Sequence, residues 1–269
     1  MQFLMRGVMP TTVSAFAILT PIHINNVIRG KMKKAIVIGA SSGIGRELSK
    51  ILIRNQYSVG IMARRVDLLA ELRNEMGNDV LVERIDVSEA DSAKDALTKL
   101  IEQMGGVELV VISAGIGHLN AELDWTLENE AIKTNVTGFV AIANVAVKHF
   151  IETGSGHLVG ISSIAALRGG RQAPAYNASK AFESNYLEGL RQKVRKLGLP
   201  ITITDIKSGF VKTAMAKGDG IFWAADADNA AMQIYDSIKR KKSTAYITRR
   251  WRLVAWAIKL MPGFIYDRL

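Results

Sequence analysis

The chain has 269 residues, of which 48% are apolar and 22% are charged, so it is long enough for one full hydrophobic core. It has no cysteine, which excludes a disulfide framework and a thiolate metal site and suits a reducing cytoplasm, and its four histidines show no metal-ligand spacing. The net charge is +10, but residues 239–269 hold nine Lys or Arg and one Asp and so carry +8 of it, which argues against a nucleic-acid groove on the body of the protein.

The first thirty-one residues differ in composition from the rest of the chain. The run 8–24 is fairly apolar, but Pro10 and Pro21 interrupt it, and it is too short to span a membrane. It has some features of a signal peptide, but a strand pattern begins directly after Met32. We therefore expect residues 1–31 to be a disordered or non-native leader, with Met32 as the natural start, which N-terminal sequencing of the native protein tests.

From Lys33 onward, apolar and β-branched runs alternate with segments of helical spacing. The runs predict strands at residues 35–38, 58–62, 80–85, 107–112, 157–161, 201–206 and 244–247. The segments between them predict helices, among them 44–54, 67–76, 90–104, 125–150 and 174–196. Continuous apolar strands alternating with helices indicate a parallel sheet covered on both faces. We therefore predict one α/β domain over residues 32–248, a doubly wound parallel sheet of about seven strands.

Ligand sites in such sheets lie at the carboxyl ends of the strands, and the first strand ends in a glycine-rich turn. Its glycines follow the spacing Gly-x3-Gly-x-Gly and open a helix, so that a pyrophosphate can approach the amides of the helix N-terminus. This placement favours dinucleotide binding over a purely structural turn. The residues expected to hold the dinucleotide are Gly39, Ser41, Ser42, Gly43, Ile44 and Gly45.

The second strand ends in a basic pair. A ribose-binding Asp or Glu would suit NAD here, whereas Arg64 and Arg65 suit the 2′-phosphate of NADP. The alternative is that the pair begins a solvated helix. After the third strand, Asp86 beside Val87 either accepts the adenine amino group or caps a helix that begins near Ser88.

The remaining strand ends carry small and hydroxyl residues. After the fourth strand, small side chains leave room for a flat ligand, and Ser162 and Ser163 follow the fifth strand. Ser113, Ala114 and Gly115 after the fourth strand are expected at this ligand, and Gly209, Val211 and Thr213 follow the sixth strand.

A tyrosine and a lysine share one face of the helix predicted over residues 174–196. Tyr176 and Lys180 are four residues apart and lie one above the other. An unperturbed tyrosine titrates near pH ~10, and a nearby cation favours its phenolate. The pair is either a surface helix face or a proton-transfer device, and the two residues alone leave both interpretations open.

Taken in order, these motifs resemble those of the short-chain dehydrogenase/reductase family, over about Lys33 to Thr248. The glycine turn resembles its cofactor loop, and Asp86 resembles its adenine-side Asp. The turn after the sixth strand resembles the family's turn by the nicotinamide, which implies that Gly209, Val211 and Thr213 bind the cofactor. The family's catalytic tetrad is matched by Asn135, Ser163, Tyr176 and Lys180. Two motifs depart from the family: Ser113 stands in a loop that often reads Asn-Asn-Ala-Gly, and Ser208 stands where Pro is usual.

The resemblance implies a Rossmann-like fold and an NADP(H)-dependent oxidoreductase that interconverts a carbonyl and an alcohol. In reduction, Tyr176 would donate the proton to the developing alkoxide, and Lys180 would lower the pKa of the tyrosine and hold the nicotinamide ribose. Ser163 would hydrogen-bond the carbonyl oxygen. Asn135 would steady a water between Lys180 and solvent. The alternative from another class is a cofactor-binding redox sensor without catalysis.

The resemblance also implies where the substrate and a second copy of the chain would bind. Substrate walls are expected near His118 and Leu119 and over residues 165–173 and 210–225, whose apolar side chains favour an acyl, steroid-like or other bulky ketone. The family forms dimers or tetramers through the helices matched here by residues 125–150 and 174–196.

The C-terminal segment 249–269 predicts a basic amphipathic helix ending before Pro262 and Gly263. Two sets of residues give it a broad apolar face. The first set follows helical spacing: Trp251, Val254, Ala255, Ile258 and Met261. The second set widens the face: Leu253, Trp256, Ala257 and Leu260. This face either packs on the body and closes the substrate pocket, or lies in a membrane interface as a peripheral contact.

Overall fold

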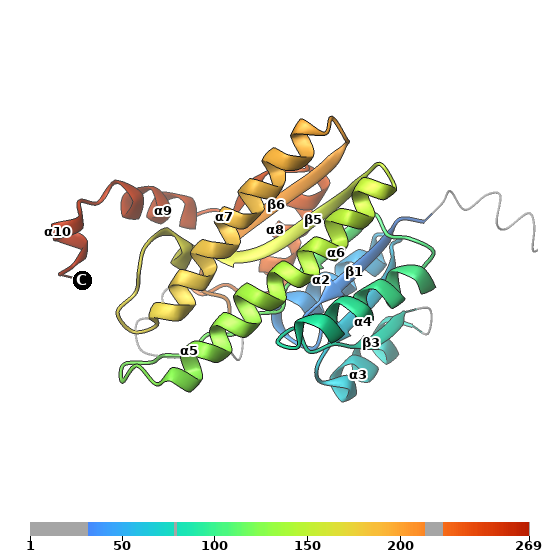
Figure 1. The fold of residues 1–269 in the computed structure, drawn as a ribbon, viewed down its shortest axis with the longest axis horizontal. Helices are drawn as coiled ribbons and strands as arrows, with labels where there is room; N and C mark the ends of the chain where they lie inside the picture. The colour runs from blue at the N-terminus through green and yellow to red at the C-terminus, as the bar shows by residue number, and fades with distance from the viewer. Residues whose placement is uncertain (1–31, 78–79, 213–222, 269) are drawn as a thin grey trace, which may run out of the picture. The chain divides into compact units, whose positions relative to one another are not determined.

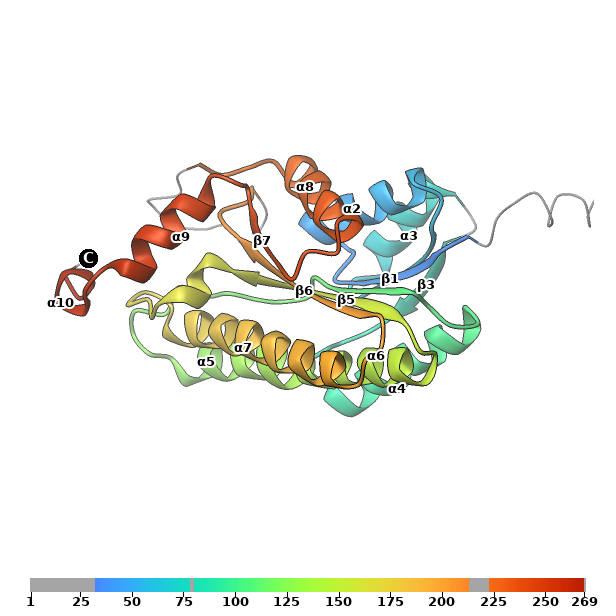
Figure 2. The same cartoon turned by 90° about the horizontal axis from the view of Figure 1, so that it is seen from above.

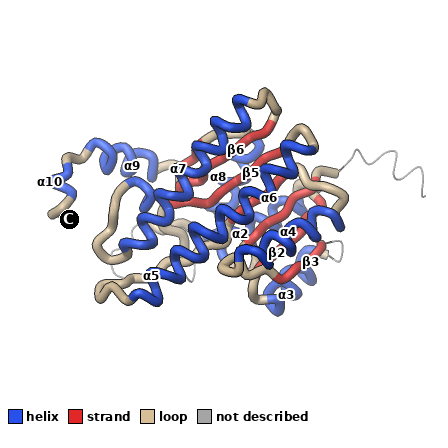
Figure 3. Tube along the Cα trace, in the orientation of Figure 1, coloured by secondary structure: helices blue, strands red, loops and turns tan. Residues whose placement is uncertain are grey.

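The computed structural model describes residues 32–77, 80–212 and 223–268. Seven strands form one sheet in the order β3-β2-β1-β4-β5-β6-β7, and all neighbouring strands are parallel. Figure 3 shows the strands of the sheet in red among the blue helices. The strands are β1 (Lys34–Ile38), β2 (Ser58–Ala63), β3 (Leu81–Arg84), β4 (Leu109–Ile112), β5 (Gly156–Ser163), β6 (Ile201–Ser208) and β7 (Thr244–Ile247).

Helices cover both faces of this sheet (Figures 1 and 2). One face carries α2 (Gly43–Arg54), α3 (Val66–Met76) and α8 (Ala227–Lys239). The other carries α4 (Ala90–Gln103), α5 (Trp125–Ile132), α6 (Phe139–Glu152) and α7 (Pro174–Lys196). Two short helices, α9 (Trp251–Leu260) and α10 (Gly263–Tyr266), follow β7. The predicted doubly wound parallel sheet of seven strands is confirmed.

The alternation of side chains along β1 explains why helices are needed on both sides. Ala35 and Val37 belong to the apolar cluster under α2 and α8, while Ile36 and Ile38 belong to the cluster under α4 and α6. Successive strand residues point to opposite faces, so a strand buried on both faces must be apolar at every position. Residues Lys33–Leu269 form one compact unit. Residues 1–31 lie outside the described part, so the expected leader stays a prediction.

Several predicted elements have different bounds, and two of these differences bear on the site. Strand β5 does not end before the serines: Ser162 and Ser163 are its last residues and pair with Lys207 and Ser208 of β6. These hydroxyl groups extend the strand because they find buried polar partners at its end. The single helix predicted over 125–150 is divided by a π-helical turn, Lys133–Gly138, which separates α5 from α6. Such turns are frequent at functional sites.

His157 in β5 makes the stability of the fold depend on pH. Its ring is buried, Nε2 lies 2.8 Å from Thr204 Oγ1, and burial, together with the charge of Lys241, lowers the pKa of His157 to about 4. Because the unfolded chain binds this proton near pH ~6.5, the free energy of unfolding should fall by roughly 3 kcal/mol as the pH drops from about 6.5 to about 4. Urea unfolding across this range measures it. His157→Gln should flatten this part of the profile, and an unchanged slope would contradict the assignment.

Candidate active site

A cleft of about 1600 Å³ opens at the carboxyl ends of the central strands. Single-ligand pockets measure roughly 300–1,000 Å³, so this cleft has room for a dinucleotide and a second ligand. Most of the predicted site residues line it. They are Gly39, Ser41, Ser42, Gly43, Ile44, Arg64, Arg65, Val87, Ser113, Ala114, Gly115, Ser163, Tyr176, Lys180, Gly209 and Val211.

Close backbone packing requires two of the glycines in the turn after β1. Gly39 has a φ of +89°, and a Cβ built on it would lie 2.5 Å from the backbone N of Ala114. A Cβ on Gly45 would lie 2.3 Å from Gly39 O. Gly45 therefore does not line the cleft as predicted. It supports the turn from behind, since only a residue without a side chain lets α2 begin so close to it.

Positive charge and hydroxyl groups converge on the same turn. Arg65 Nη2 donates to Ser41 Oγ at 2.9 Å and to Ser42 Oγ at 2.8 Å. The first turn of α2, which follows directly, contains no acidic residue. A helix N-terminus with a guanidinium and two hydroxyls beside it fits a phosphate group, so these residues can hold the phosphates of a dinucleotide. Arg64 also lines the cleft, but it is Arg65 that contacts the serines.

The side chain of Asp86 does not cap a helix, because α4 begins at Ala90 with Glu89 as its N-cap; Asp86 instead closes the turn before it. Its Oδ1 accepts hydrogen bonds from Ser88 N at 3.1 Å and from Ser88 Oγ at 2.7 Å, just before α4 begins. The neighbouring Val87, rather than Asp86, lines the cleft. Adenine binding by Asp86 stays a prediction, and Thr213 lies outside the described residues.

Asn135 lies in the π-helical turn and is fully buried. Its Oδ1 accepts from Ile116 N at 2.9 Å, and its Nδ2 donates to Ile116 O at 2.8 Å and to Ser179 Oγ at 3.0 Å. The amide therefore does not face the open cleft. It ties the loop after β4 to α7 at Ser179, the residue next to Lys180.

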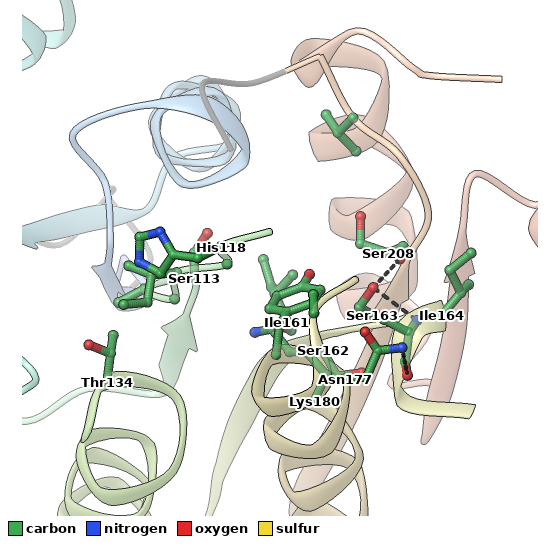
Figure 4. A pocket seen from close by; sticks show the side chains of 18 of the residues that line it. Ser113, His118, Thr134, Ile161, Ser162, Ser163, Ile164, Asn177, Lys180 and Ser208 are labelled. Atoms are coloured by element: carbon green, nitrogen blue, oxygen red, sulfur yellow. Dashed lines mark hydrogen bonds between the residues drawn. The ribbon is translucent and has the colours of Figure 1, made fainter. Parts of the chain in front are cut away.

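Tyr176, Lys180 and Ser163 meet on one wall of the cleft. Lys180 Nζ lies 6.0 Å from the centroid of the Tyr176 ring, and Lys180 is only 4% exposed. At the end of β5, Ser163 Oγ donates to Ser208 O at 3.2 Å and accepts from Ala165 N at 3.1 Å (Figure 4). The interpretation of Tyr176 and Lys180 as a surface helix face is therefore wrong, because α7 turns this face inward.

Lys180 has a buried partner that the sequence reading missed. Its Nζ donates to Ile161 O at 3.1 Å and to both carboxylate oxygens of Glu183 at 2.9 Å each. Burial raises the pKa of Glu183 to about 7, even though the charge of Lys180 opposes this. Burial alone would lower the pKa of Lys180, but the charges of Glu183 and Tyr176 outweigh it and raise that pKa. The i,i+3 spacing on α7 was the available signal.

A second buried ion pair lies behind Ser163, between β5, β6 and α7. Lys207 Nζ lies 2.6 Å from Asp205 Oδ2 and donates to Ser184 Oγ at 2.6 Å. Ser162 Oγ donates to Asp205 Oδ1 at 2.5 Å. Ser162 therefore joins the buried ion pair to the cleft, since both Ser162 and its neighbour Ser163 line the cleft. The sequence signal was an acid and a base two positions apart in a strand whose other residues are Ile, Thr and Ser.

The C-terminal segment closes one end of the cleft. Arg168, in the loop after β5, donates through Nε to Ile258 O at 3.5 Å and through Nη2 to Met261 O, and its guanidinium lies 5.2 Å from the ring of Tyr266. The Tyr266 hydroxyl donates to Gly169 O at 2.6 Å. Ile258 and Tyr266 line the cleft. The packing role expected for this segment is therefore present.

The two apolar sets of the C-terminal segment differ in solvent exposure. Trp251 and Ala255 are buried, and Val254, Ile258 and Met261 are half-buried, whereas the second set faces outward. Together with Phe264 and Ile265, the large members of that set form what we call the outer face: Leu253, Trp256, Leu260, Phe264 and Ile265. None of the helices described between residues 32 and 268 is both long and apolar enough to cross a membrane.

Known proteins share both the sequence pattern and the fold. A family model described as short chain dehydrogenase matches residues 33–220. The chain is 40% identical over 188 residues, 68% of its own length and 74% of the relative's, to an uncharacterised oxidoreductase of Myxococcus xanthus.

Among solved structures, a short chain dehydrogenase/reductase from Burkholderia phymatum in complex with NAD superposes with a TM-score of 0.75 at 19% identity, covering 83% of this chain and 92% of that one. The closed form of a serine dehydrogenase complexed with NADP+ gives a TM-score of 0.71 at 21% identity, covering 79% and 93%. At such identities these two structures establish the fold.

Proposed function

The chain belongs to the short-chain dehydrogenase family, and from that premise we propose that it uses NADP(H) to interconvert a carbonyl and an alcohol on an apolar substrate. It is an NAD(P)-dependent oxidoreductase. The alternative of a non-catalytic sensor gains no support, because the relatives are named oxidoreductases. One observation carries the proposal: the Tyr176–Lys180 face of α7 is turned into the cleft, with Ser163 on the same wall.

We assign the proton to the Tyr176 hydroxyl. In reduction it donates to the substrate oxygen as charge grows there, and the ammonium of Lys180 stabilises the phenolate that remains. The hydroxyl of Ser163 turns from Ser208 O to the substrate oxygen and stabilises the same charge. When bound, the nicotinamide supplies or accepts the hydride. The turn after β1, Arg64 and Arg65 hold the phosphates, and Asn135 keeps the loop after β4 in place.

We infer a bulky apolar carbonyl substrate from the described walls at the substrate end. Their apolar members are Leu119, Ile164, Phe210, Ile258 and Tyr266. Oxidation of NADPH in the presence of a panel of steroid, long-chain acyl and small charged keto-acid substrates tests both the activity and this inference. We expect turnover on the bulky apolar ketones. Preference for the small keto acids would refute the substrate class, and no turnover on any carbonyl would refute the activity.

We further propose that Arg64 selects NADPH over NADH. A charge-assisted hydrogen bond to a 2′-phosphate contributes about 1.5–3 kcal/mol, so Arg64→Ala should weaken NADPH binding roughly ten- to hundredfold and leave NADH binding nearly unchanged. Fluorescence titration of both dinucleotides measures this. Arg65→Ala should weaken both, because it also removes the contacts to Ser41 and Ser42.

Arg73→Ala is the matched control for the cofactor prediction, since this arginine is exposed on α3, the helix that follows the basic pair. It should change the affinity for neither dinucleotide. Equal losses of NADPH and NADH in Arg64→Ala, or a wild-type preference for NADH, would refute the assignment.

We propose that the outer face of α9 and α10 docks on an anionic membrane surface. Apolar side chains including an exposed tryptophan, flanked by basic residues, match an interfacial helix, and the +8 charge of residues 239–269 attracts anionic lipid. Pairing of two copies through this face would bring +8 against +8, so a second copy is the less favourable occupant. Assembly into a dimer is instead expected through α5, α6 and α7, as in the family. The cytoplasmic location stays a prediction.

Vesicle co-sedimentation tests the membrane proposal. Wild type should bind anionic phosphatidylglycerol vesicles, bind neutral ones weakly, and lose binding as salt is raised. Trp256→Glu should abolish most of the binding. Met232→Glu on α8 is the control, since Met232 is 50% exposed and α8 belongs neither to the outer face nor to the helices expected at the dimer contact. Equal losses in the two variants, or a wild type that never sediments, would refute the proposal.

A further inference from the structure

The ammonium group of Lys180 has no hydrogen-bond donor to spare. An ammonium carries three donors, and here one goes to Ile161 O and two go to the carboxylate of Glu183. Glu183 is 0% exposed, so this carboxylate cannot exchange Lys180 for water. A buried carboxylate that takes two of the three donors governs both the position of Lys180 and the net charge that Lys180 presents to its surroundings.

The groups that face this pair are few and charged. On α7, Tyr176 lies one turn before Lys180. On β6, Asp205 and Lys207 act on Glu183 with opposite signs. Lys207 is itself held by Asp205 at 2.6 Å, so the two largely cancel. The charge on Glu183 therefore has one main consequence in the site, which is how strongly the Lys180 ammonium acts on the Tyr176 hydroxyl.

We propose that Glu183 is a positioning residue that holds Lys180 through both carboxylate oxygens and, by offsetting its charge, sets how strongly Lys180 stabilises the phenolate of Tyr176. This inference rests on the proposed function in that Tyr176 is the proton donor. When Glu183 is ionised, the Lys180–Glu183 pair is nearly neutral and the phenolate gains little. When Glu183 is neutral, the full charge of Lys180 acts on Tyr176 and favours the phenolate.

Protonation of Glu183 makes this arrangement depend on pH. Burial raises the pKa of Glu183 to about 7, while the pKa of Lys180 stays raised, so Glu183 is the member of the pair that titrates. Below about pH 7, Glu183 is neutral and the full charge of Lys180 acts on Tyr176. Above about pH 7, the Glu183 carboxylate offsets most of that charge. Substitution of Glu183 by a neutral residue of the same shape therefore isolates the effect of the carboxylate charge on Tyr176.

Phenolate absorbance of the cofactor-free protein tests the proposal directly. The Tyr176 component is the difference between the alkaline titrations of each protein and of its Tyr176→Phe counterpart. In Glu183→Gln, which keeps the shape but removes the charge, the Tyr176 midpoint should fall by about one pH unit or more. Glu188→Gln, an exposed carboxylate on the same helix, should leave the midpoint unchanged.

A midpoint in Glu183→Gln that is unchanged or higher would overturn the proposal and leave a purely structural ion pair. Glu183→Asp keeps the charge and decides the matter if Glu183→Gln does not fold. A Tyr176 midpoint in Glu183→Asp that matches wild type supports the proposal, and a departure from wild type by a full unit or more overturns it. These titrations need neither cofactor nor substrate, so they separate failure of this inference from failure of the proposed activity.

Discussion

Tyr176→Phe should lose nearly all turnover and still bind NADPH. Phenylalanine keeps the ring against the cleft wall but removes the only hydroxyl that we assign to proton donation, and positioned acids contribute roughly 10²–10⁴-fold to rate. The measurements are kcat with the best ketone of the panel and the dissociation constant for NADPH. Since the ring remains in place, the dissociation constant should change little.

The matched control for this substitution is Tyr186→Phe on the same helix. The Tyr186 hydroxyl accepts a hydrogen bond from Asn144 Nδ2 at 3.0 Å, away from the cleft. Its loss should leave kcat near the wild-type value. A Tyr176→Phe enzyme with a wild-type rate would remove Tyr176 from the mechanism, whatever the outcome for the other residues of the site.

Lys207→Met should cost roughly 3–5 kcal/mol of unfolding free energy, the usual result of removing one member of a buried ion pair. The methionine matches the length of the lysine, so the loss comes from leaving the buried Asp205 without the ammonium that lies 2.6 Å away. Urea unfolding at neutral pH measures it.

Lys212→Met serves as the control for the buried pair. Lys212 lies 2.9 Å from Asp226, but the two side chains are 65% and 60% exposed, and pairs of this kind contribute about 0–1 kcal/mol. A loss below about 1 kcal/mol in Lys207→Met would show that water or rearrangement compensates Asp205, and that the pair does not hold the end of β5 against β6.

Local patterns were sufficient for much of the fold. A strand such as β1 must be apolar at every position to be buried on both faces, and the sequence Lys34–Ile38 is nearly so. The glycine turn was recognisable because backbone packing at Gly39 and Gly45 leaves no room for a Cβ. The end of β5 was misplaced because Ser162 and Ser163 look like loop residues until their partners on β6 are known.

The sequence by itself determined three features: the succession of strands and helices along the chain, the glycine turn, and the placing of Tyr176 and Lys180 on one helix face. Each of these depends on residues close together in the chain. Only the tertiary structure decided which face of α7 turns inward, which arginine meets Ser41 and Ser42, and which side of α9 covers the cleft. It also buried Glu183 against Lys180. Burial and charge compensation depend on segments far apart in sequence, such as β5, β6 and α7, and no local pattern records how these approach one another.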